Sequence, residues 1–214
     1  MPRKAVPFSN IFPLHINARA HNREAFKAPM DEIWLIMENY LFVISSIFEI
    51  KIHSFVLMPN HFHLIFLPTE NNVGAALNYF MRETSKEIGL ISHRINQVYG
   101  GRNYKTLITN ERYYLTAYKY VYRNPVKAKL CNRVEDYRYS TLSSLMGNTK
   151  SFIPLEEDTL LFSPNFSERT LLWLNEEPLK KDYEDATKAM RRSIFTLPLD
   201  KDSKKLSRLE TELF

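Results

Sequence analysis

Cysteine and long apolar runs are almost absent from this chain of 214 residues. The single cysteine, Cys131, excludes an internal disulfide and a zinc site built from several cysteines. We therefore expect an intracellular, reducing location. No run of about 18 apolar residues occurs, so we expect no membrane span. The first residues also lack the apolar core of a signal peptide.

Several familiar sequence signatures are missing as well. The chain contains no phosphate-binding loop, no dinucleotide-binding fingerprint and no internal repeat. A nucleotide cofactor is therefore not expected. The composition, 44% hydrophobic and 25% charged, is that of an ordinary globular protein.

Positive charge is concentrated in one central block, residues 82–133. The block carries eleven basic and three acidic side chains, a net charge of +8, whereas the whole chain has +5. Aromatic rings can stack on unpaired bases while Lys and Arg follow the phosphates, so this block predicts a nucleic-acid partner. A solvated helix face with scattered charges is the alternative. The block also holds seven tyrosines: Tyr99, Tyr104, Tyr113, Tyr114, Tyr118, Tyr120 and Tyr122.

The pattern of apolar residues predicts strand, helix, strand, strand, helix, strand and helix, in that order. The first six elements match the ferredoxin-like split βαβ arrangement, an α+β fold. In it, helices cover one face of an antiparallel sheet, and the other face would be free for a ligand. Strands are expected at 11–17, 50–57, 61–67 and 104–108, and helices at 28–48, 72–93 and 110–123.

The character of the sequence changes near residue 147, where prolines begin to separate short helical pieces and the charge turns acidic. We expect one domain over residues 1–146 and a helical C-terminal extension over 147–214. Two or three short helices and a mobile tail after Leu199 are expected in the extension. It could cover the functional site, bind DNA or act as a stabilising cap.

His61 and His63 form the most informative pair of residues. They lie in a predicted strand that follows a turn at Pro59 and Asn60. Side chains alternate between the two faces of a strand, so both imidazoles point the same way, about 6–7 Å apart. Such a pair can form half of a metal site. Two polar residues on an exposed sheet face would show the same spacing.

Tyr120 and Asn124 supply a second pair. They stand four residues apart on a predicted helix that ends before Pro125, and therefore share one face of it. If this helix lies near the histidines, two imidazoles and one amide oxygen can surround a cation beside a phenol. This mixed set suits Mg²⁺ or Mn²⁺ better than a structural zinc ion. A core tyrosine and a helix-terminal asparagine are the alternatives.

Five motifs in order resemble the IS200-like transposases that combine an HUH motif with a single tyrosine, and specifically the branch of REP-associated tyrosine transposases. The resemblance covers residues 8–146. The motifs are His15–Arg19 with Asn22–Phe26, Met58–His63, Gly101–Thr106, Tyr120–Ala128 and Val134–Thr141.

The resemblance implies a ferredoxin-like enzyme that acts on single-stranded or hairpin DNA. His61 and His63 would be metal ligands, Tyr120 the nucleophile and Asn124 the third ligand, directly or through a water. The expected reaction is nicking and strand transfer through a 5′-phosphotyrosine, with Mg²⁺ or Mn²⁺. We also expect four basic residues of these motifs to contact DNA: Arg19, Arg102, Lys105 and Arg123.

The same resemblance predicts a bacterial cytoplasmic protein associated with the nucleoid, either a monomer or a homodimer. Two other functions are compatible with the sequence. A protein that kept the fold could bind DNA hairpins without catalysis. An unrelated metal-dependent hydrolase could use the histidines while its tyrosines are structural.

Overall fold

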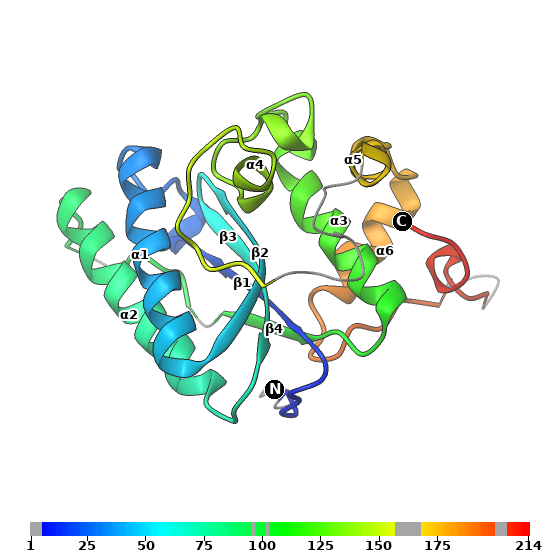
Figure 1. Ribbon diagram of the computed structural model, residues 1–214, viewed down its shortest axis with the longest axis horizontal. Helices are drawn as coiled ribbons and strands as arrows, with labels where there is room; N and C mark the ends of the chain where they lie inside the picture. Colours follow the sequence, from blue (N-terminus) through cyan, green and yellow to red (C-terminus); the bar gives the residue numbers. More distant parts are fainter. Residues whose placement is uncertain (1–5, 96, 102, 157–167, 200–204) are drawn as a thin grey trace.

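A four-stranded antiparallel sheet lies between two groups of helices in the computed structural model of the chain (Figure 1). The structure describes residues 6–95, 97–101, 103–156, 168–199 and 205–214. The strand order is β2-β3-β1-β4. With one helix in each crossover, this is the predicted ferredoxin-like split βαβ arrangement. The elements that form it are β1 (Leu14–Arg19), α1 (Met30–Phe48), β2 (Ile50–Met58), β3 (His61–Pro68), α2 (Val73–Ile91) and β4 (Tyr104–Leu107).

Helices α1 and α2 cover one face of the sheet, as predicted (Figure 1). Alternate strand residues such as Ile16 and Phe62 point into this core and are fully buried. The ring of Phe62 lies 5.6 Å from that of Phe80 and 5.8 Å from that of Phe55. Side chains alternate along a strand, so the neighbours of these buried residues face the opposite side of the sheet. This core therefore determines which residues are presented on the second face.

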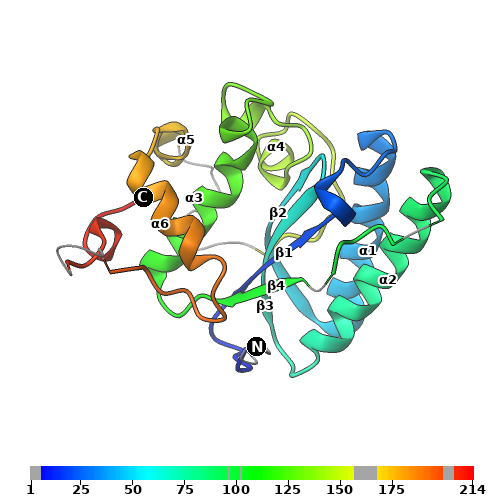
Figure 2. The same cartoon turned by 180° about the vertical axis from the view of Figure 1, so that it is seen from behind.

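The second face is not free, contrary to our expectation. Helix α3 (Glu111–Lys127) packs on it, and Val56 and Ile65 of the sheet share a core with Ala117 and Val121 of the helix. Figure 2 shows this layer, with α6 beside α3, on the opposite side of the sheet from α1 and α2. A ligand is therefore restricted to the part of the face that α3 leaves uncovered.

The sequence predicted that helix α3 ends before Pro125. This prediction is wrong, because the helix continues through Pro125 to Lys127. Proline removes one backbone donor, yet it stands in the last turn, where few further intrahelical bonds depend on it. The backbone N–H of Ala128 still donates to the carbonyl of Asn124 at 2.9 Å. Pro125 is also buried, and tertiary packing therefore outweighs its local preference. At the other end, the Asn110 side chain caps the helix through the N–H of Tyr113.

The C-terminal extension shares its core with the rest of the chain. Leu174, Ala186 and Phe195 pack in the same cluster as α3. Residue 147 thus does not separate two cores among the described residues. The remaining elements are η1 (His21–Arg23), η2 (Val134–Asp136), α4 (Thr141–Leu145), α5 (Glu168–Asn175), α6 (Lys180–Ala189) and η3 (Arg208–Glu210).

The predicted mobile tail falls partly on residues 200–204, which lie outside the described residues. Residues 205–214 are packed rather than loose. Leu209 and Phe214 are buried, and Ser207 donates a hydrogen bond to Asp185 at 3.0 Å. Among the described residues, no helix has the length and apolar character needed to cross a membrane.

Replacing Phe62 by alanine tests the core that orients the sheet. Because Phe62 is fully buried, we expect the free energy of unfolding to fall by about 3–5 kcal/mol. Phe42 on α1 is 49% exposed, and Phe42→Ala should cost about 1 kcal/mol or less. Urea denaturation measures both values. Equal losses of unfolding free energy in the two variants would contradict the assignment of Phe62 to the core and of Phe42 to the surface.

Candidate active site

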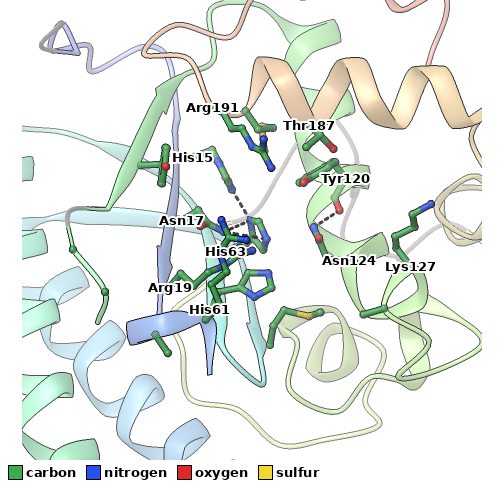
Figure 3. A pocket seen from close by; sticks show the side chains of 18 of the residues that line it. His15, Asn17, Arg19, His61, His63, Tyr120, Asn124, Lys127, Thr187 and Arg191 are labelled. Carbon is green, nitrogen blue, oxygen red and sulfur yellow. Dashed lines mark hydrogen bonds between the residues drawn. The ribbon is translucent and has the colours of Figure 1, made fainter. Parts of the chain in front are cut away.

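A pocket of about 630 Å³ opens on the second face of the sheet, beside α3 (Figure 3). Polar side chains enter it from β1 and β3 because of the strand register. Asn17 pairs with His63, and Arg19 pairs with His61, so each pair projects from the same face. We call this the central pocket. The residues that line it include His15, Asn17, Arg19, His61, His63, Tyr104, Tyr120, Asn124, Lys127, Thr187 and Arg191.

The structure brings the two predicted histidines together. Their ring centroids are 5.0 Å apart, with the planes at 79°. Both belong to one rigid strand, so their separation is set before any ligand arrives. His63 is buried, whereas His61 is half-buried at the side of the pocket.

Asn60 determines which nitrogen of His61 faces the pocket. The Asn60 amide nitrogen donates to the carbonyl of Arg23 at 2.7 Å. This bond orients the Asn60 oxygen toward Nδ1 of His61, at 2.6 Å. Since an amide oxygen only accepts, Nδ1 must carry the proton, and Nε2 keeps its lone pair. A second hydrogen bond of this kind commonly orients a metal-binding imidazole.

His63 is oriented by the first strand. Its Nδ1 lies 2.8 Å from Nε2 of His15, and the two rings stack with centroids 5.1 Å apart. The amide nitrogen of Asn17 lies 3.2 Å from Nε2 of His63 and 3.3 Å from its Nδ1. Asn17 and His15 therefore fix the position of the His63 ring from two sides.

Burial keeps the three imidazoles neutral at pH 7. It lowers the pKa of His15 to about 3, with the neighbouring His61 as the second cause. It lowers the pKa of His61 to about 4, with the charge of Arg19 as the second cause. Burial also holds the pKa of His63 well below its ordinary value. Neutral imidazoles are the form that binds a metal ion.

Tyr120 and Asn124 enter the same pocket from α3, as the i, i+4 spacing predicts. The Tyr120 ring meets that of His63 edge-on, with centroids 5.9 Å apart. Asn124 donates from its amide to the carbonyl of Tyr120 at 2.8 Å. Its oxygen lies 3.4 Å from the hydroxyl of Tyr183, which belongs to α6. Figure 3 shows the histidines and Tyr120 on opposite sides of the pocket.

The set of ligands for a metal ion is incomplete without a substrate. In the part of the chain that the structure describes, no three His, Cys, Asp or Glu side chains are placed to hold a metal ion. Two imidazoles and at most one amide oxygen would leave several positions to water or phosphate. Mg²⁺ commonly keeps several water ligands when it is bound to a protein.

The central pocket is cationic. Arg19, Arg23, Lys127 and Arg191 line it, whereas no Asp or Glu among the described residues does so. Of the four residues predicted to contact DNA, Arg19 is therefore in the pocket. Arg102 lies outside the described residues.

Two of the predicted DNA contacts are elsewhere. Lys105 pairs with Ile16, whose side chain is buried under α1 and α2, so Lys105 projects from the face opposite the pocket. Arg123 is buried and donates to the carbonyls of Leu174 and Asn175, at 3.2 and 2.6 Å. Its guanidinium thus holds α5 against α3 and does not face the pocket. The sequence could not predict this burial, because burial cannot be read from a local run of residues.

Sequence reasoning missed His15 and Asn17 as parts of the site. A signal was present, since His15, Asn17 and Arg19 alternate with Leu14, Ile16 and Ala18 on one strand. Tyr183 and Arg191 were also missed. No local pattern distinguishes them, because only the packing of the extension brings Arg191 to the pocket and Tyr183 against Tyr120 and Asn124.

A solved structure shares this architecture. The chain is similar to a REP-associated tyrosine transposase bound to a REP hairpin, with a TM-score of 0.60 and 17% sequence identity. This chain has the transposase fold. The match covers 76% of this chain and 96% of the transposase chain. No protein-family model matches the chain, and no curated protein matches it by sequence.

The buried His15 should make stability depend on pH. Its folded pKa of about 3 lies below the ordinary 6.5, so the unfolded chain binds more protons between these values. The free energy of unfolding should therefore fall as the pH drops below 6.5, by up to about 1.4 kcal/mol per pH unit for one such histidine. His15→Asn should make this dependence shallower. Urea denaturation in EDTA at pH 4 to 7 measures it, and identical slopes in both proteins would contradict the prediction.

Proposed function

We propose that this protein is a metal-dependent DNA nickase and strand transferase of the REP-associated tyrosine transposase type. Tyr120 would form a 5′-phosphotyrosine with single-stranded or hairpin DNA. The observation that carries the proposal is the convergence of His61, His63 and Tyr120 in one cationic pocket. The fold of a transposase that binds a REP hairpin supports it.

The chemistry of the pocket favours a phosphodiester substrate. In the part of the chain that the structure describes, four cationic side chains and no carboxylate line it, which suits a polyanion. Tyr104 lies at its side with 38% exposure and offers a ring to an unpaired base. DNA with a single-stranded segment presents both groups, whereas bases inside a duplex are already stacked.

The residues present fit a divalent cation. His61, His63 and Asn124 would hold Mg²⁺ or Mn²⁺, with water and phosphate completing the shell. The bound ion would polarise a non-bridging phosphate oxygen. The protein itself orients both imidazoles through Asn60 and His15 and keeps them neutral.

Tyr120 would perform the covalent step. A bond forms between its Oη and phosphorus while the bond from phosphorus to the DNA 3′-oxygen breaks. The phenol loses its proton to solvent, and the departing 3′-oxygen takes one up. A DNA 3′-hydroxyl can later attack the phosphotyrosine and release Tyr120, which transfers the strand without loss of bond energy.

Replacing Tyr120 by phenylalanine tests the nucleophile. The variant should bind hairpin DNA as the wild type does but form no covalent adduct in Mn²⁺, because the attacking oxygen is gone. Denaturing gels detect the adduct, and fluorescence anisotropy measures binding. Tyr118→Phe is the matched control, since Tyr118 is on the same helix but lies in the core and should not be needed for the adduct.

The outcomes also separate the competing functions. An adduct formed by Tyr120→Phe would refute the assignment of the nucleophile. Wild-type binding without any adduct or cleavage would indicate a non-catalytic hairpin binder. Cleavage without an adduct would indicate a metal-dependent hydrolase.

The double variant His61→Ala, His63→Ala tests the metal ligands. Adduct formation that depends on Mn²⁺ should vanish, and the amount of Mn²⁺ bound, measured by electron paramagnetic resonance, should fall to background. Circular dichroism should be unchanged. His93→Asn is the control, since His93 is exposed and is not among the lining residues. Mn²⁺ binding equal to that of the wild type would reject the site.

A further inference from the structure

The C-terminal segment forms one wall of the central pocket. Thr187 of α6, and Met190 and Arg191 just beyond it, are among the lining residues. Figure 3 shows α6 passing over the pocket, opposite the strand that carries His63. Covering the functional site was one of the three roles that the sequence left open for the extension.

The backbone around Arg191 is fastened to β4. The buried Thr106 hydroxyl donates to the carbonyl of Met190 at 3.0 Å. On the other side of Arg191, the N–H of Leu107 donates to Ser193 at 2.9 Å, and that of Phe195 donates to Leu107 at 2.8 Å. Both ends of this short segment are therefore tied to the sheet that carries the histidines. A side chain at position 191 starts from a fixed point, which lowers the entropy lost when it binds a ligand.

The side chain of Arg191 extends toward the space between His15, His63 and Tyr120 (Figure 3). Two other cations of the C-terminal segment are paired: Arg208 with Asp182, and Lys188 with Asp185 at 3.5 Å. Among the described residues, no carboxylate forms a salt bridge with Arg191. Its donors are thus available to a ligand in the pocket.

Arg191 stands where an anion would be bound from two sides. Arg19 approaches from β1 and Arg191 from the end of α6, and none of the described acidic residues lines the pocket. A guanidinium offers a planar pair of donors that matches two oxygens of a phosphate. Attack at phosphorus needs a phosphate held close to the Tyr120 hydroxyl, and Arg191 extends toward that side of the pocket.

We propose that Arg191 binds a DNA phosphate in the central pocket and helps to position it for Tyr120. The C-terminal segment is then part of the active site and not an appended cap. This inference rests on the proposed function, because the ligand it names is the DNA backbone.

Arg192 provides a matched control. It is the adjacent residue, is also an exposed arginine and carries the same charge, but it is not among the residues that line the pocket. Arg191→Gln and Arg192→Gln therefore change the net charge equally. Any difference between them comes from the position of the side chain.

Binding is measured first, with Tyr120→Phe as the background so that no chemistry intervenes. The probe is a DNA hairpin with a single-stranded 5′ extension, titrated by fluorescence anisotropy from 50 to 300 mM salt. Losing one phosphate contact should reduce the slope of log K against log salt by about 0.7–1. We expect this change for Arg191→Gln and a clearly smaller one for Arg192→Gln.

Adduct formation with Tyr120 intact is measured separately. Arg191→Gln should slow it by about 10- to 100-fold, the effect of losing a charge-assisted hydrogen bond. Arg191→Lys should restore the salt slope but only part of the rate, because lysine keeps the charge and loses the paired donors. A purely structural role would not separate these two readouts. Thermal melting checks that each variant is folded.

The phosphate contact would be overturned if Arg191→Gln and Arg192→Gln gave equal salt slopes, or if neither variant changed the slope. A wild-type rate in Arg191→Gln would overturn the positioning role. Failure of the proposed function has a different signature: the wild type itself forms no adduct. A selective change of slope in Arg191→Gln would still support the phosphate contact in that case.

Discussion

The antiparallel register between β1 and β3 is the constraint on which the pocket depends. It sets Asn17 opposite His63 and Arg19 opposite His61. Because strand side chains alternate, the residues between them, Ile16, Ala18 and Phe62, are directed into the core under α1 and α2. The apolar half of the alternation therefore holds the polar half in place. A shift of one residue would turn the histidines into the core under α1 and α2 and turn Phe62 toward the pocket, which would disrupt both faces of the sheet.

Two hydrogen-bond relays extend this order to individual ring nitrogens. Asn60 orients His61, and His15 orients His63. The first relay keeps the proton of His61 on Nδ1, and the second holds the ring of His63 against β1. Burial keeps the rings neutral, which costs stability at low pH but preserves their ability to bind a cation. The site is thus arranged by backbone geometry and by neighbours that need not touch the substrate.

The opposite wall is built from segments far apart in the sequence. Helix α3 continues through Pro125 and presents Tyr120 to the histidines. The extension then packs on α3, and Tyr183 meets the Tyr120 ring with centroids 5.0 Å apart. Arg123, buried beneath α5, helps to hold this layer together. Residues that appeared to be an appendage in the sequence therefore complete the pocket, and the charge that appeared to be a DNA contact is structural.

The sequence itself determined the element order and the strand pairing at Pro59 and Asn60. It also determined that His61 shares a face with His63, and Tyr120 with Asn124. Each follows from a period of two or 3.6 residues, which depends only on local backbone geometry. The tertiary structure decided the rest: that α3 covers the second face, that Arg123 is buried while Arg191 enters the pocket, and that His15 supports His63. These outcomes depend on which surfaces meet, and burial of apolar area between distant segments has no local signature in the chain.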